Sequence, residues 1–323
     1  MSPQRDARGI AETARLPLGG IAQWISIHGR DAGNPVLIAL HGGPGVPETA
    51  LVRHFNGALE DVFTVVHWDQ RGAGKSFAKT IPESSMTVEQ FVRDLDALVE
   101  HVRRRLGTDK VVLLGHSWGS ALGTLYAARY PQKVAAYVGT GQIGNLQASE
   151  LASYAFVLEE AKRRGNAKAV AELTGLGPPP YTEKQMMVQR RWLARFVGTL
   201  GSLPVLKALA IMFLRRGGSP FDLPGIVRGM MFSLRTLWSE VSKINLERDV
   251  PELKMPVWFL SGRHDHQVDA GVAAAYFEKL IAPRKTLLWF ETSGHFVPFE
   301  EPAAFNAAML EVARALAVPG TPA

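Results

Sequence analysis

The chain contains no cysteine, and this absence limits the chemistry open to it. Without thiols it has no disulfide, no thiolate nucleophile and no cysteine-ligated metal. It also lacks any uninterrupted apolar run near the roughly 18 residues of a membrane-spanning helix, and its start has no apolar segment typical of a secretory signal. We therefore expect a cytoplasmic protein with no stable membrane insertion, no metal and no cofactor.

Low-complexity tracts are absent too, and charged residues make up only 20% of the 323 positions. Hydrophobic residues make up 46%, enough for one large core that carries an insertion. We expect loose termini over residues 1–18 and 318–323. The sequence leaves the oligomeric state open.

Acidic residues are scarce in one segment. Residues 161–239 hold 13 Lys/Arg against 3 Asp/Glu, a net +10 that exceeds the +6 of the whole chain. Such a segment suits nucleic acid or an anionic membrane surface, but a solvated face is the simpler interpretation. We expect no nucleic-acid partner.

Short apolar runs alternate with longer amphipathic segments, a pattern typical of a parallel sheet with helices on both faces. Residues 87–106 form the clearest helix, with a Thr87/Gln90 capping box and Gly107 after the end. Further helices are expected over 117–130, 270–281 and 302–316. The expected strands are 21–28, 35–40, 62–68, 110–115, 134–139, 256–262 and 286–291.

The alternation stops between residues 145 and 240, where the sequence becomes helical and rich in arginine. We interpret this segment as an inserted helical lid. The predicted core then comprises residues 1–144 and 241–323. Its fold class is α/β, with a mostly parallel twisted sheet flanked by helices.

Ser117 lies in the sequence GHSWG, which matches G-x-S-x-G between a predicted strand and a predicted helix. In that context the serine sits on a strained turn whose neighbours must be small. A serine hydroxyl becomes a strong nucleophile only when a base removes its proton. The motif therefore predicts nucleophilic catalysis by Ser117.

Three motifs, HGGPG (41–45), DQRGAGKS (69–76) and GHSWGS (115–120), together resemble the proline iminopeptidase branch of the α/β hydrolases. The resemblance covers residues 20–145 and 245–316, and not the lid. It implies an α/β-hydrolase fold in which the amide of Gly43, with Gly42 as its neighbour, and the amide of Trp118 hold the oxyanion. Preorganised N–H donors stabilise the negative charge that acyl transfer builds on oxygen.

The other two catalytic groups should follow the serine in the order acid, then histidine. Asp265 lies just after the predicted strand 256–262, and His295 follows the last strand, so both loops end at the same edge of the sheet. Asp265 would orient the imidazole and His295 would act as general base. The competing residues are less well placed: Asp249 and Asp269 for the acid, and His41, His264 and His266 for the base.

The lid combines bulky apolar residues with arginines, which predicts an apolar pocket beneath it. A proline iminopeptidase needs carboxylates in its lid to pair with the substrate's ammonium, and this lid is short of acids. The candidate substrate-binding residues are His41, Glu159, Glu160, Trp192, Trp238 and Glu240, with Glu172 as a further carboxylate.

These features favour a serine hydrolase that cleaves an ester or lactone through an acyl-enzyme. Its partner would be a small-molecule substrate with a hydrophobic acyl or alcohol group. The alternative implied by the resemblance is a proline iminopeptidase that releases N-terminal proline. A non-catalytic ligand-binding protein is a remote third hypothesis.

Overall fold

The structure is a computed structural model, and it describes residues 9–197, 211 and 223–317. Two parts of the predicted lid, 198–210 and 212–222, lie outside the described residues. The predicted loose segments 1–8 and 318–323 lie outside them as well.

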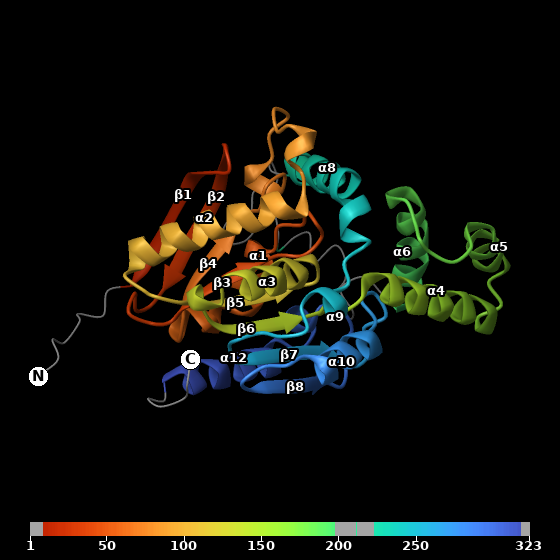
Figure 1. The fold of residues 1–323 in the computed structure, drawn as a ribbon. Coiled ribbons are helices and arrows are strands. Elements are labelled where there is room, and N and C mark those ends of the chain that lie inside the picture. The colour runs from red at the N-terminus through yellow and green to blue at the C-terminus, as the bar shows by residue number, and fades with distance from the viewer. Residues whose placement is uncertain (1–8, 198–210, 212–222, 318–323) are drawn as a thin grey trace, which may run out of the picture.

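Eight strands form one mixed sheet in the order β1-β2-β4-β3-β5-β6-β7-β8 (Figure 1). The pairings β1–β2 and β2–β4 are antiparallel, and all later pairings are parallel. This sheet confirms the predicted α/β-hydrolase fold. The strands are β1 (Ile10–Leu18), β2 (Ile21–Gly29), β3 (Val36–Leu40), β4 (Thr64–Trp68), β5 (Val111–His116), β6 (Val134–Thr140), β7 (Val257–Gly262) and β8 (Lys285–Phe290).

The prediction of a loose N-terminus was wrong for residues 10–18, which form the edge strand β1. Burial alternates along β1, so only every second side chain is partly covered. The resulting hydrophobic alternation is weak, because many of the residues are polar, and it did not predict a strand. Gly19 and Gly20 adopt positive φ angles of 54° and 83° in the turn to β2. Glycine permits this backbone, and the resulting hairpin pairs β1 with β2 along its whole length.

Helices cover both faces of the sheet. Side chains of α2 (Val88–Leu106), α3 (Trp118–Arg129) and α10 (Ala270–Lys279) share one core with Val111 and Leu113 of β5. Side chains of α12 (Pro302–Ala317) pack with Val112 and Leu114 on the opposite face. Successive residues of a strand point to opposite faces, so the apolar run Val111–Leu114 of β5 contributes to both cores.

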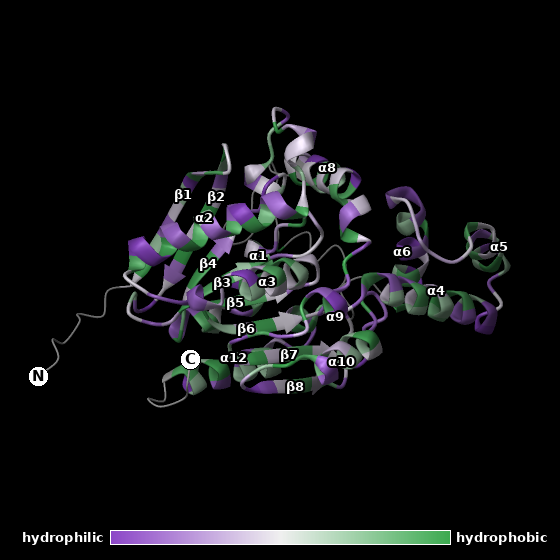
Figure 2. Cartoon of the chain, in the orientation of Figure 1, coloured by the Kyte–Doolittle hydropathy of each residue, from purple (hydrophilic) through white to green (hydrophobic). Residues whose placement is uncertain are grey.

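Helix α2 shows how the sequence determines the ends of an element. The Thr87 side chain accepts the N–H of Gln90 at 3.1 Å, and Gly107 ends the helix in the left-handed conformation. Figure 2 shows both hydrophilic and hydrophobic stretches along α2, as expected for a helix with one solvated face. The predicted helix 87–106 is confirmed.

Between β6 and β7 the described chain forms α4 (Leu146–Arg163), α5 (Ala167–Leu176), α6 (Glu183–Val197), α8 (Leu223–Val241) and the short α9 (Leu246–Asp249). Helices α4, α5 and α6 share a small core of their own that includes Val157, Leu173 and Leu193. In Figure 1 these three helices lie beyond the ends of β6 and β7. They fall within the segment predicted to be a lid.

The described part of the chain also contains the short α-helices α1 (Thr49–Phe55), after β3, and α11 (Val297–Glu300), after β8. In the described part of the chain, no helix is long and apolar enough to cross a membrane.

Candidate active site

Ser117 occupies the tight turn between β5 and α3, with φ 54° and ψ −120°. No other described non-glycine residue has a positive φ. The turn needs glycine on both sides: a Cβ on Gly115 would lie 2.5 Å from the carbonyl oxygen of Gly119, and one on Gly119 would lie 2.0 Å from that of Leu40. The strained geometry and the small neighbours are those expected for a nucleophile elbow.

Asp265 and His295 meet at the carboxyl ends of β7 and β8, two adjacent parallel strands. Oδ2 of Asp265 lies 2.8 Å from Nδ1 of His295, and both side chains are buried. Oδ1 accepts the backbone N–H groups of Gln267 and Val268, at 2.9 and 3.0 Å. Burial opposes ionisation of this carboxyl, but the charge and hydrogen bond of His295 and these two N–H groups outweigh it and lower the pKa of Asp265.

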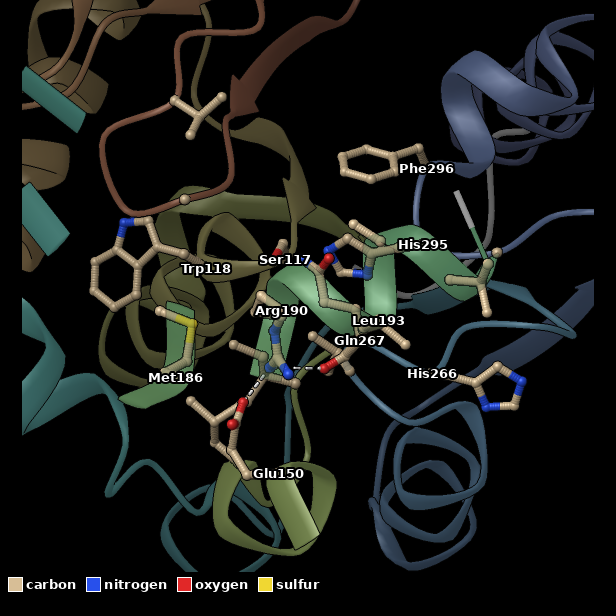
Figure 3. A pocket seen from close by; sticks show the side chains of 18 of the residues that line it. Ser117, Trp118, Glu150, Met186, Arg190, Leu193, His266, Gln267, His295 and Phe296 are labelled. Atoms are coloured by element: carbon tan, nitrogen blue, oxygen red, sulfur yellow. Dashed lines mark hydrogen bonds and ion pairs between the residues drawn. The ribbon is translucent and has the colours of Figure 1, made fainter. Parts of the chain in front are cut away.

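The hydrogen bond to Asp265 places the proton of His295 on Nδ1 and leaves Nε2 as an acceptor. Nε2 is buried and has no hydrogen-bond partner among the described residues, so the bond from Ser117 is not made in this structure. Ser117 and His295 nevertheless line the same pocket (Figure 3). Hydrogen bonds between nucleophile and base are often looser before substrate binds.

The predicted oxyanion donors divide into two groups. Gly43, with φ 114°, and Trp118 line the pocket beside Ser117. Trp118 is the first residue of α3, where a backbone N–H has no partner within the helix. The N–H of Gly42 instead donates to Oε1 of Glu48 at 3.3 Å, so its role is to shape the loop.

The pocket has a volume of about 540 Å³ and lies between the sheet and the helices that follow β6. Its wall combines the predicted nucleophile and base with many apolar side chains. The apolar residues that line it include Val46, Ile143, Leu146, Met186, Leu193, Val197, Met230, Leu234, Trp238, Val241, Val268 and Phe296. Such a wall suits a substrate with a sizeable apolar part.

The wall of the pocket also contains an ion pair that was not predicted from the sequence. Glu150 on α4 is 3% exposed and forms an ion pair with Arg190 on α6 (Figure 3). Arg190 also donates to the carbonyl of Gln267 at 3.1 Å. Oε2 of Glu150 is buried and has no hydrogen-bond partner among the described residues. Burial outweighs the effect of Arg190 and raises the pKa of Glu150.

A signal for Glu150 was present in the sequence. On α4 the side chains of Leu146, Glu150, Ser153 and Val157 are buried, and their spacing places them on one side of the helix. A carboxylate at such a position needs a partner or a function.

Two of the predicted substrate-binding residues are tryptophans, and only one of them lines the pocket. Trp238 lines the pocket and donates its indole N–H to the carbonyl of Tyr181 at 2.7 Å. Trp192 is not among the lining residues; it packs in the core of α4, α5 and α6 and donates to Glu172 at 2.9 Å.

His41 and the three glutamates lie outside the described pocket lining. Nε2 of His41 accepts the N–H of Gln70 at 3.1 Å, which makes this histidine part of the loop framework. Glu159 is exposed, and Glu160 pairs with two arginines of its own helix region. Glu240 accepts the N–H of Val88 at 2.8 Å, at the start of α2. None of these four side chains therefore lines the pocket beside Ser117, and local partners hold His41, Glu160 and Glu240.

Within the described residues, no group of three or more His, Asp or Glu side chains is arranged to hold a metal ion. The pocket instead holds groups suited to acyl-transfer chemistry, namely the hydroxyl of Ser117, the imidazole of His295 and backbone amides, beside the charged residues Glu150, Arg190 and Glu300.

Comparison with known proteins agrees with this geometry. Residues 35–178 match the family model described as alpha/beta hydrolase fold. Over 309 residues the chain is 33% identical to a probable aminopeptidase, YbaC, of Bacillus subtilis (strain 168), covering 94% of this chain and 96% of that protein. It is 39% identical over 124 residues to a proline iminopeptidase of Neisseria gonorrhoeae, covering 38% of each.

Among solved structures, a proline iminopeptidase-related protein from Thermus thermophilus superposes with a TM-score of 0.66 at 21% identity, covering 97% of this chain and 100% of that chain. At this identity the match shows the fold alone. Together these findings define a hydrolase of the α/β-hydrolase fold. The chain belongs to that family, and within it to the branch similar to proline iminopeptidases.

Proposed function

We propose that the protein is a serine hydrolase that cleaves an ester or lactone with a hydrophobic part through an acyl-enzyme. The observation that carries the proposal is the state of His295: Asp265 holds its Nδ1, and Nε2 has no hydrogen-bond partner in the described part of the chain, at the pocket that Ser117 also lines. A base so arranged can take the serine proton.

In the proposed reaction Ser117 Oγ attacks the substrate carbonyl carbon while Nε2 of His295 takes the hydroxyl proton. The amides of Gly43 and Trp118 donate to the oxygen that becomes negative. The carbonyl then re-forms, and the bond to the leaving alcohol breaks as His295 returns the proton to it. A water molecule attacks the acyl-enzyme by the same route, which releases the acid and restores Ser117.

The apolar wall supports a hydrophobic acyl or alcohol group, because each buried methylene contributes about 0.8 kcal/mol. The pairing of Glu150 supports the same choice. The carboxylate of Glu150 is already paired with Arg190, which offsets the attraction it would offer to a substrate ammonium.

Proline iminopeptidase activity is the second candidate, and two observations favour it. Oε2 of Glu150 is a buried acceptor without a partner among the described residues, in a side chain that lines the pocket, and such a group can bind an ammonium. The relatives named above are described as a probable aminopeptidase and a proline iminopeptidase.

The test compares two substrates on one preparation. We expect p-nitrophenyl esters to be hydrolysed with kcat/KM that rises with acyl length, and prolyl naphthylamide to be cleaved at least tenfold less efficiently. A fluorophosphonate probe should label the wild type and leave Ser117→Ala unlabelled. A clear preference for the prolyl substrate would replace the ester proposal with the second candidate, and a folded wild type that resists the probe would contradict both.

A further inference from the structure

A second buried pair of histidine and carboxylate lies directly behind the nucleophile. Nδ1 of His116 is 2.7 Å from Oε1 of Glu48, and both side chains are less than 10% exposed. Neither residue lines the pocket described above, so the pair does not touch a substrate there. Glu48 lies just before α1, and His116 is the residue before Ser117.

The two partners of the His116 ring define its protonation. Nε2 lies 3.1 Å from the backbone carbonyl of His295, and a carbonyl only accepts hydrogen bonds. Nδ1 faces the carboxyl group of Glu48, so an imidazolium, in which both ring nitrogens donate, satisfies both partners. Burial works against this charge, but the charge and hydrogen bond of Glu48, the His295 carbonyl and the charge of Asp265 outweigh it and raise the pKa of His116.

This pair connects three catalytic segments. Oε1 of Glu48 also accepts the N–H of Gly42, next to the proposed oxyanion donor Gly43. His116 bonds to the backbone of the base, and its ring lies 5.0 Å from the ring of His295 between centroids. From these contacts, and on the basis of the proposed function, we infer that Glu48 and His116 are positioning residues that hold the oxyanion loop and the base in register with Ser117.

The surroundings leave little room for the pair to shift. A Cβ on Gly42 would lie 3.2 Å from Ser117 Cβ and 3.3 Å from His116 Nδ1. The loop of Gly42, the turn at Ser117 and the imidazole of His116 are therefore closely packed. The His116 ring also contacts Phe296 and Phe299, which follow the base. Displacements of about 1 Å among reacting groups lower rates by about 100-fold, so loss of the pair should reduce kcat.

Glu48→Ala tests the inference, with Glu48→Gln as the conservative variant and Asp96→Ala as the matched control. Asp96 forms a partly exposed ion pair with Lys133, at 2.6 Å, between helix α2 and the residue that precedes β6, away from the pocket. With a p-nitrophenyl ester and active sites counted by fluorophosphonate labelling, Glu48→Ala should lower kcat 10- to 100-fold and change KM less than threefold. Glu48→Gln should recover at least half of the loss on a logarithmic scale, and Asp96→Ala should stay within twofold of the wild type.

A double-mutant cycle separates a positioning role from a merely structural one. If the pair acts as a unit, the double variant of His116→Ala and Glu48→Ala should have a kcat within threefold of that of the slower single variant. The inference would be overturned if the losses of kcat in the two single variants multiplied in the double variant. A wild-type kcat per active site in Glu48→Ala would also overturn it. If Glu48→Ala does not fold, the single variants Glu48→Gln and His116→Ala replace it. A wild-type kcat in both of them would overturn the inference. A wild type that neither hydrolyses esters nor labels would refute the proposed function instead.

Discussion

Nδ1 of His295 lies 2.8 Å from Oδ2 of Asp265, although 30 positions separate the two residues in the chain. Their loops follow β7 and β8, which are parallel neighbours, so the topology of the sheet brings the two side chains together. The contact determines which ring nitrogen carries the proton, and therefore which nitrogen is available in the pocket.

Replacing this carboxylate should cost most of the catalytic rate. In Asp265→Asn the amide can donate to Nδ1, which favours the tautomer with a proton on Nε2 and removes the acceptor for the serine proton. We expect kcat for a p-nitrophenyl ester to fall by about 10³- to 10⁴-fold at neutral pH, with KM little changed. A folded Asp265→Asn enzyme within tenfold of the wild-type kcat would contradict the assignment.

The strain at Ser117 predicts a difference between two inactive variants. Alanine at this position keeps the unfavourable positive φ, whereas glycine adopts it freely. Both Ser117→Ala and Ser117→Gly should lose turnover and probe labelling, but Ser117→Gly should be more stable than Ser117→Ala by roughly 1 kcal/mol. Urea unfolding followed by fluorescence measures the difference. Equal or reversed stabilities would show that the turn stores no such strain.

Gly141 supports the base from the side. Its φ is 51°, and a Cβ there would lie 2.8 Å from Cε1 of His295. Gly141→Ala should therefore displace the imidazole and lower kcat about tenfold or more. The matched control is Gly20→Ala, which has a positive φ of 83° but nothing within 4 Å of the added Cβ. That variant should lose stability and keep the wild-type kcat; equal kcat in both variants would contradict a role for Gly141.

The charge state of His116 predicts how stability depends on pH. Its folded-state pKa is raised above 6.5, so its contribution is present in full below pH 6.5 and is lost as pH rises through the folded-state pKa. In Glu48→Gln the raising effect of Glu48 is gone and burial favours the neutral ring. The stability difference between wild type and Glu48→Gln should therefore be larger at about pH 6 than at about pH 9. Denaturant unfolding at both pH values measures it, and a difference that grows with pH would refute the imidazolium.

The sequence predicted those features whose cause is local or fixed by topology. Capping residues and glycine defined α2, and the serine motif between β5 and α3 located the turn. Asp265 and His295 were predicted to lie close together because parallel strands end at one edge of a sheet, and the structure places them in contact. Strand β1 escaped prediction, because an edge strand with one covered face has only a weak hydrophobic pattern.

The contacts that escaped prediction join distant parts of the chain. Glu150 and Arg190 are 40 positions apart, and Glu48 and His116 are 68 positions apart. The spacing along α4 indicates a buried position for Glu150, but the sequence does not show which distant residue pairs with it. Only the packing of α4 against α6, and of the loop after β3 against β5, shows which charges pair.

Glu150 offers the sharpest separation of the two candidate activities. Under the ester proposal its carboxylate is part of the pocket wall and not a ligand for charge, so Glu150→Gln should change kcat/KM for p-nitrophenyl esters by less than about threefold. Under iminopeptidase activity, losing the charge that faces the substrate ammonium should raise KM for prolyl naphthylamide by about tenfold or more, because a hydrogen bond to a charged group contributes about 1.5–3 kcal/mol. Glu159→Gln is the matched control, since Glu159 is exposed on the same helix and does not line the pocket. A selective loss on the prolyl substrate in Glu150→Gln alone would identify Glu150 as an ammonium ligand, and an unselective loss on both substrates would show that its pairing with Arg190 holds α4 and α6 in place.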